Sequence, residues 1–235
     1  MKWVLLIRHL QSEKNIEDRF AKASDPAALT SIGRDDSVVL GAEIASFRDF
    51  LGAYACSVHC SSSRRSLESA QAVADALGTS IEQHYALDSF VDRETSGMDY
   101  GELMSNNPGL ARRLNLYRAG IFNSYNLIYE RERLEKYEAS INEELDLIVS
   151  GPAQLLVVVA HRSALTSALI GIARKSRVYP VDFFGYVPID LGAIALAAEN
   201  DRHAWSVVFA NLSIRDVNGI GRALVSDWLA SSGLA

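Results

Sequence analysis

The sequence has few cysteines, no long apolar run and no excess of positive charge. Its 235 residues include two cysteines, Cys56 and Cys60, which are too few for a disulfide framework. No run approaches the ~18 consecutive apolar residues that would cross a bilayer. The formal net charge of −6 argues against nucleic acid as a partner, because polyanions require a basic face. We therefore expect neither a membrane nor a nucleic acid as a partner.

Targeting and nucleotide-binding motifs are also missing. The opening apolar run at 3–7 is short and is followed at once by charges, which is unlike a secretory signal. We therefore expect a cytoplasmic protein. No Gly-x-x-x-x-Gly-Lys-Ser/Thr loop occurs, and Gly219-x-Gly221 lacks the strand-to-helix setting of a phosphate-binding loop. A nucleotide-binding fold is therefore disfavoured, although a few arginines in a cleft can still bind a small phosphorylated ligand.

The segment Cys56-x-x-His59-Cys60 offers residue types that bind metals. No second ligand cluster accompanies it along the sequence, and the alternation over 55–60 predicts a strand instead. We therefore expect no metal there. His59, His84 and His203 match no motif, and we expect them to be structural or on the surface.

Apolar runs and helical patterns alternate along the chain. The runs at 3–7, 55–60, 82–87, 154–160, 191–198 and 205–209 predict six strands. Helical spacing predicts helices at about 30–49, 64–77, 127–149 and 163–173, with Thr30 as the N-cap of the first. Strands that alternate with helices are typical of a mainly parallel, doubly wound sheet. We therefore predict a three-layer α/β fold with helices on both faces of the sheet, in a single domain spanning 1–235.

Two segments depart from this alternation. The region at about 89–127 is rich in Asn, Gly and Arg, and we expect a helical insertion over the active-site edge of the sheet. The tail at 214–230 has an apolar stripe, and we expect it to pack back against the sheet more readily than to meet a partner. The oligomeric state is left open, with a homodimer as one alternative.

The segment from Ile7 to Asn15 carries the strongest functional signal. It reads Ile-Arg-His-Leu-Gln-Ser-Glu-Lys-Asn and follows directly on the apolar run at 3–7. In an open α/β sheet, ligands bind at the carboxyl ends of the strands. An Arg-His pair that leaves such a strand places a nucleophile and an anion-binding cation at that edge.

This segment resembles the Arg-His-Gly-x-Ser-x-x-Asn signature of the histidine phosphatase superfamily, the phosphoglycerate mutase-like proteins. Arg8, His9, Ser12 and Asn15 match the signature, whereas Leu10 stands where the family has glycine. Glycine would let the backbone approach a phosphate or adopt a positive φ. We therefore expect Leu10 to add bulk at the wall of the pocket.

Four further segments resemble the same family, in the same order. Leu29–Gly33 resembles its Leu-Thr-x-x-Gly helix start, and Ser61–Ala70 resembles its Ser-x-x-x-Arg-Ala-x-Gln-Thr-Ala segment. Asp92–Gly101 is similar to its acidic loop, and Leu155–His161 to the strand that ends in its second catalytic histidine. The resemblance spans residues 3 to about 173 and implies the phosphoglycerate mutase-like fold.

The resemblance also implies a role for each matching residue. His9 would be the nucleophile that forms a phosphohistidine, and His161 would hydrogen-bond the same phosphoryl group. Arg8 and Arg65 would present fork-shaped donors to the phosphate oxygens, a geometry that lysine cannot copy. As in the family, Ser12 and Asn15 would line the pocket.

The acid–base role has two candidates, and two further arginines adjoin the matched positions. Glu94 would protonate the leaving oxygen and then deprotonate water. It precedes Gly97 by three residues where the family usually has four, so Asp92 competes for the role. Arg64 is expected to be a solvated neighbour of Arg65. Arg162, which stands where the family commonly has glycine, either adds a cation or turns to solvent.

Together these roles imply a metal-independent phosphatase without a cofactor, acting on a small phosphorylated substrate. A mutase of the same family is the nearest alternative, because it uses the same pocket. The family's glycolytic mutases carry a Glu-Arg-His-Tyr-Gly loop, which Arg93–Gly97 does not reproduce, so hydrolysis is favoured. A catalytically impaired member that only binds phosphate is a second alternative, motivated by Leu10 and Arg162.

Overall fold

A computed structural model describes residues 1–17, 26–91, 96–112, 131–175, 189–200 and 204–232. The strands are β1 (Lys2–Arg8), β2 (Cys56–Ser61), β3 (Ile81–His84), β4 (Leu155–Ala160), β5 (Ile194–Glu199) and β6 (Trp205–Leu212). The helices are α1 (Glu13–Ile16), α2 (Ser31–Leu51), α3 (Arg64–Leu77), α4 (Tyr100–Asn106), α7 (Arg131–Ser150), α8 (Arg162–Lys175) and α9 (Arg222–Ser232). Short helical turns are η1 (Tyr85–Leu87), η2 (Ile214–Asp216) and η3 (Val217–Gly221).

All six predicted strands and all four predicted helices are present. One difference is at 82–87, where the strand ends at His84 and the chain continues as the turn η1. Within the described ranges, no helix combines the length and the apolar character that crossing a bilayer demands.

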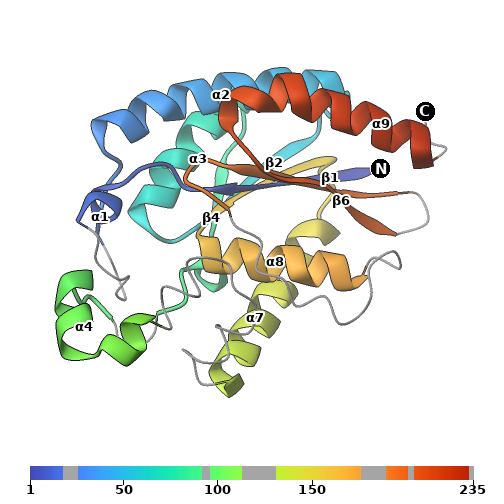
Figure 1. Cartoon of the computed structure of the whole chain (residues 1–235). Helices are drawn as coiled ribbons and strands as arrows, with labels where there is room; N and C mark the ends of the chain where they lie inside the picture. Colours follow the sequence, from blue (N-terminus) through green and yellow to red (C-terminus); the bar gives the residue numbers. More distant parts are fainter. Residues whose placement is uncertain (18–25, 92–95, 113–130, 176–188, 201–203, 233–235) are drawn as a thin grey trace.

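The strands form one sheet in the order β3-β2-β4-β1-β5-β6 (Figure 1). β3, β2, β4 and β1 run parallel to one another, whereas β5 and β6 are antiparallel to their neighbours. A parallel strand covered on both faces has an unbroken apolar sequence. The central strand β4 fits this rule, because all of Leu155–Ala160 is buried. The mainly parallel sheet confirms the prediction.

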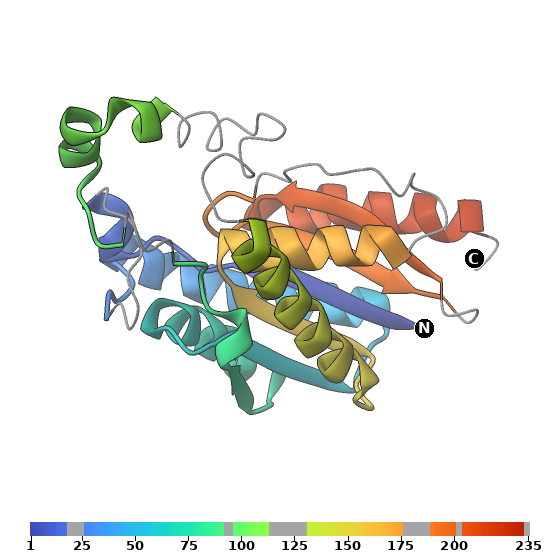
Figure 2. The same ribbon diagram turned by 90° about the horizontal axis from the view of Figure 1, so that it is seen from below.

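Helices cover both faces of the sheet (Figures 1 and 2). Because successive strand residues point to opposite faces, β1 contributes to two cores. Trp3, Leu5 and Ile7 pack with residues of α2, α3 and α9. Val4 and Leu6 pack with residues of α7 and α8. The three-layer α/β architecture is therefore as predicted.

The start of α2 holds the chain that follows β1. Thr30 is the N-cap as predicted, and its side chain accepts a hydrogen bond from the Gly33 amide at 3.0 Å. The Thr30 amide in turn donates to the Gln11 carbonyl at 3.1 Å. A Cβ at Gly33 would lie 2.1 Å from that carbonyl oxygen, so only glycine allows this approach. The Leu-Thr-x-x-Gly segment thus fixes the path of the residues after His9.

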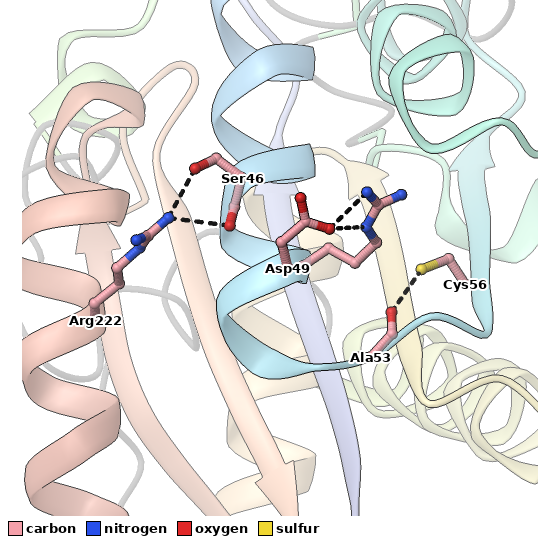
Figure 3. A network of polar contacts seen from close by, with 6 residues as sticks. Ser46, Asp49, Ala53, Cys56 and Arg222 are labelled. Carbon is pink, nitrogen blue, oxygen red and sulfur yellow. Dashed lines mark hydrogen bonds and ion pairs between the residues drawn. The ribbon is translucent and has the colours of Figure 1, made fainter.

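The C-terminal segment packs back against the sheet, as predicted. Val217 and Val225 are fully buried in the core that contains Trp3. Arg222 of α9 donates to the carbonyl and the hydroxyl oxygens of Ser46 at 3.0 and 2.7 Å (Figure 3). These hydrogen bonds tie α9 to α2 alongside the apolar contacts.

The described part of the predicted insertion contains the helix α4. It lies beyond the same end of the sheet as α1, which is the end where β1 finishes (Figures 1 and 2). Residues 92–95 and 113–127 lie outside the described residues. The insertion over the active-site edge therefore stays a prediction for the region as a whole.

Candidate active site

The carboxyl ends of β1 and β4 bring two histidines together. These strands are parallel neighbours, with Arg8 opposite Ala160, and the next residue in each chain segment is a histidine. The His9 amide donates to the Ala160 carbonyl at 3.0 Å, which continues the pairing past the strand end. The rings of His9 and His161 consequently lie 5.0 Å apart between centroids, edge to face. The two strand-to-histidine segments therefore form one site.

His9 is held in one tautomer. Its Nδ1 lies 2.8 Å from the Leu10 carbonyl oxygen. A carbonyl only accepts hydrogen bonds, so Nδ1 carries the proton and Nε2 keeps its lone pair. Burial, followed by His161, Arg8 and Arg65, lowers the pKa of His9 well below its usual range. The ring is therefore neutral at pH 7, with one unprotonated nitrogen available for nucleophilic attack.

His161 is held by two serines, one at the end of β2 and one just after it. Its Nε2 lies 3.0 Å from Ser61 Oγ and 3.1 Å from Ser63 Oγ. Its Nδ1 lies 3.5 Å from Nη2 of Arg65, which can only donate, so Nε2 carries the proton. Burial and then the nearby cations, Arg65 foremost, lower the pKa of His161. This ring is neutral as well.

Two buried arginines flank the histidines. Arg8 is 9% exposed, and its Nη1 donates to the Ile189 carbonyl at 2.8 Å. Arg65 is 3% exposed and lies in the first turn of α3. Each guanidinium lowers the pKa of both histidines, so both charges act on the same site. Such a positively charged site with planar donor groups suits a phosphate.

Two further arginines adjoin the site in the sequence. Arg162 begins α8 and is half-buried, and its Nε is shielded from solvent without a hydrogen bond to the described residues. Arg64 has a side chain that is 63% exposed, with its Nε 2.7 Å from Glu68 Oε1 one turn further along α3. Arg64 is therefore a solvated neighbour of Arg65, as predicted.

Ser12 and Asn15 bond to each other in the turn after His9. The Ser12 amide and hydroxyl donate to Asn15 Oδ1 at 3.0 and 2.6 Å. Ser12 is fully buried at the start of α1. These contacts give the pair a role in shaping the turn, and their predicted contact with phosphate stays a prediction.

The expectation that Leu10 adds bulk at the pocket wall is wrong. Its side chain is 2% exposed and belongs to the core beneath α2, α3 and α9. It packs so closely on Gly192 that a Cβ there would lie 2.8 Å from Leu10 Cδ2. Among the described non-glycine residues, Asn211 alone has a positive φ, so Leu10 has no need of glycine's freedom. Its amide donates to Ser69 Oγ at 3.1 Å, which ties the segment to α3.

Replacing Leu10 with glycine, the residue of the family signature, should therefore lower stability without raising the rate. Loss of a buried leucine side chain leaves a cavity and costs roughly 3 kcal/mol of unfolding free energy. Urea titration of the wild type and Leu10→Gly measures this loss, with Leu10→Met as the volume-conserving control. A Leu10→Gly variant that is faster than the wild type and equally stable would show that Leu10 does add bulk at the pocket wall.

Glu94 and Asp92, the candidate acid–base residues, lie outside the described residues. The segment that leads to them is anchored beside the site. The Ser62 amide donates to Asp88 Oδ1 at 2.8 Å, and the Tyr137 hydroxyl donates to the Asp88 carbonyl at 2.8 Å. The Phe90 amide donates to Ser163 Oγ at 3.1 Å, two residues beyond His161. The loop therefore departs from a point next to the second histidine.

Several of these contacts were not expected from the sequence. We assigned no role to Ser61 and Ser63, although their place at the end of a strand was an available signal. The contacts of Asp88, Tyr137 and Ser163 join distant parts of the chain, and no local pattern indicated them.

Comparison with known proteins places the chain in a family. The sequence profile of the histidine phosphatase superfamily, branch 1, matches residues 4–211. The chain therefore belongs to the histidine phosphatase superfamily. A search of curated protein sequences finds no match.

Solved structures share the fold at low sequence identity. YhfR of Bacillus stearothermophilus superposes with a TM-score of 0.71 and 17% identity, covering 91% of this chain and 99% of that one. A mycobacterial glucosyl-3-phosphoglycerate phosphatase in complex with VO3 has a TM-score of 0.70 and 15% identity, covering 91% and 100%. A phosphoserine phosphatase variant from Entamoeba histolytica, in complex with phosphoserine, has a TM-score of 0.62 and 15% identity, covering 90% and 97%. These similarities confirm the predicted phosphoglycerate mutase-like fold.

Proposed function

We propose that the chain is a metal-independent phosphatase that hydrolyses a small phosphorylated substrate through a phosphohistidine at His9. The observation that carries the proposal is the fixed tautomer of His9. The ring that carries this unprotonated Nε2 is buried beside a second histidine, and two guanidinium groups act on it electrostatically. The phosphatases among the similar structures support hydrolysis as the reaction.

The first step forms the phosphohistidine. Nε2 of His9 attacks phosphorus, and the bond between phosphorus and the ester oxygen breaks as the nitrogen–phosphorus bond forms. Arg8 and Arg65 stabilise the charge on the equatorial oxygens, and His161 hydrogen-bonds the same group. The leaving oxygen takes a proton from a carboxylic acid, for which Glu94 is the first candidate and Asp92 the second.

The second step releases phosphate. The carboxylate formed in the first step takes a proton from water, whose oxygen attacks phosphorus as the bond to His9 breaks. Inorganic phosphate leaves, and the acid is restored. Positive charge at both steps comes from the two arginines, so the proposed reaction calls for no metal ion.

Two alternatives share this pocket. A mutase would return the phosphoryl group to the substrate, and the sequence of the acidic loop, unlike that of the glycolytic mutases, argues against it. A catalytically impaired binder was suggested by Leu10 and Arg162. The burial of Leu10 in the core removes the first of these two motives.

Hydrolysis of p-nitrophenyl phosphate in the presence of EDTA tests the proposal. We expect the acid limb of the pH–rate profile to lie below the usual pKa of an imidazole, because burial, His161 and the two arginines lower the pKa of His9. Rapid quenching into base should trap an acid-labile phosphohistidine, which mass spectrometry locates at His9. Interconversion of phosphoglycerate isomers without phosphate release would instead show a mutase. Phosphate binding without turnover would show an impaired member of the family.

A further inference from the structure

A second pair of histidines lies in a different pocket, on the α7 side of β2 and β3. The pocket has a volume of about 460 Å³, and His59, Glu82, His84 and Glu144 form its polar wall. In the register of the two strands, His59 lies opposite Glu82, and His84 lies next but one along β3. Directly paired and alternate residues of neighbouring strands project from the same face. The sheet therefore presents these three side chains together.

Three ligand atoms converge at this place. Nδ1 of His59 lies 2.9 Å from Nε2 of His84 and 3.7 Å from Oε2 of Glu82. One atom from each of the three residues falls within 4.8 Å of the other two. Both histidine side chains are at most 10% exposed, whereas Glu82 is 69% exposed and can adjust its position.

The other nitrogen of each ring is held by a polar partner. Nδ1 of His84 lies 2.7 Å from Oε1 of Glu144, and Nε2 of His59 lies 2.8 Å from Ser57 Oγ. Histidines that bind metals nearly always donate their second ring N–H to a carboxylate or another acceptor, which fixes the tautomer. Glu144 and Ser57 occupy the positions of such second partners, beside the ring nitrogens that would not bind the metal.

The protonation states are compatible with ligation. Because the Glu144 carboxylate accepts, Nδ1 of His84 carries the proton and its Nε2 presents a lone pair. That lone pair accepts the proton of His59 Nδ1 when no ion is bound. A shift of this proton to Nε2, where Ser57 can accept it, frees the second lone pair without changing either charge.

We infer that His59, His84 and Glu82 form a binding site for a divalent transition metal ion, with zinc as the best match. Imidazole and carboxylate ligands suit zinc, and three protein ligands leave a fourth position for water or a small ligand. The site goes beyond the proposed function, since no step of the phosphatase reaction uses it. It also differs from the Cys56-x-x-His59-Cys60 segment, because Cys60 lies in the core on the other face of the sheet. Burial raises the pKa of the Cys60 thiol to about 12.

Titration of the metal-free, full-length protein with Zn²⁺ tests the inference. Isothermal titration calorimetry should show one saturable equivalent, and Co²⁺ in place of Zn²⁺ should give the visible absorption of a four-coordinate site. We expect Glu82→Gln to weaken Zn²⁺ binding roughly 10-fold or more, and Glu144→Gln to weaken it ~10–100-fold as an outer partner. His84→Gln should abolish the equivalent. Glu143→Gln, the exposed neighbour of Glu144, is the matched control and should bind as the wild type does.

The histidines of the active site are the competing location. His9→Gln separates the two sites, because it removes a ring from the active-site pair and leaves the second pocket intact. Zn²⁺ binding that survives His84→Gln and is lost in His9→Gln would overturn the inference, as would a wild type without saturable binding. Circular dichroism of the metal-free variants checks folding. The exposed Glu82 provides a ligand variant that keeps the core unchanged. None of these readouts depends on phosphatase activity.

Discussion

Replacing His9 with alanine should lower kcat by at least ~10⁴-fold, because the nucleophile forms the covalent bond on which both steps depend. Phosphate binding should weaken far less, since Arg8 and Arg65 remain in the pocket. Steady-state hydrolysis of p-nitrophenyl phosphate gives the first quantity. Calorimetric titration with inorganic phosphate gives the second. The pairing of a large kinetic loss with retained binding distinguishes a missing nucleophile from a collapsed site.

We also expect the His9→Ala variant to contain no phosphohistidine after rapid quenching into base. A variant that keeps its turnover, or that still carries the modification, would show that another residue is the nucleophile. His161 is the residue to examine in that case, although its Nδ1 faces Arg65 and its Nε2 carries the proton. Neither nitrogen is therefore prepared for attack as Nε2 of His9 is.

Arg65→Ala should reduce kcat/KM by roughly 10²–10³-fold, whereas Arg64→Ala should change it by less than about 2-fold. The two residues are adjacent and chemically identical, but Arg65 is 3% exposed beside His161 and the Arg64 side chain is 63% exposed. This pair is a matched control for charge, for helix position and for handling of the protein. Equal losses in the two variants would contradict the assignment of Arg65 to the phosphate.

A lysine at position 65 refines the same experiment. Arg65→Lys keeps the charge and loses the planar pair of donors. We expect its kcat/KM to fall between those of the wild type and Arg65→Ala. A lysine variant as active as the wild type would mean that charge alone suffices at this position.

The main elements of the fold could be predicted because each is marked by a local pattern. The fully buried strand β4 has an unbroken apolar sequence, and α2 has both its N-cap at Thr30 and a left-handed glycine, Gly52, at its end. The strand at 82–87 was predicted too long because Tyr85–Leu87 continues the apolar run while the backbone turns into η1. A periodicity signal cannot separate these two outcomes over three residues.

The sequence pointed to the histidines and arginines of the candidate site, but it did not reveal the contacts that hold them. His9 and His161 follow apolar strands directly, so their meeting at one sheet edge follows from the parallel arrangement. The direction of the Leu10 side chain could not be predicted from the sequence, because a side chain just beyond the end of a strand can turn to either face of the sheet. Its place against Gly192 depends on a contact between residues far apart in the sequence. The cluster of His59, Glu82 and His84 could not be predicted for the same reason, because it depends on the register in which β2 pairs with β3.

The central place of β1 has a consequence for how the protein is made. Among the described strands β1 comes first in the sequence, and its partners are Leu155–Ala160 and Ile194–Glu199, which are synthesised much later. Its buried apolar residues therefore have no native partner strand during most of translation, and pairing over such separations is slow. An unpaired apolar strand is prone to aggregate, so β1 is exposed to that risk until β4 and β5 have been made and the sheet can close around it.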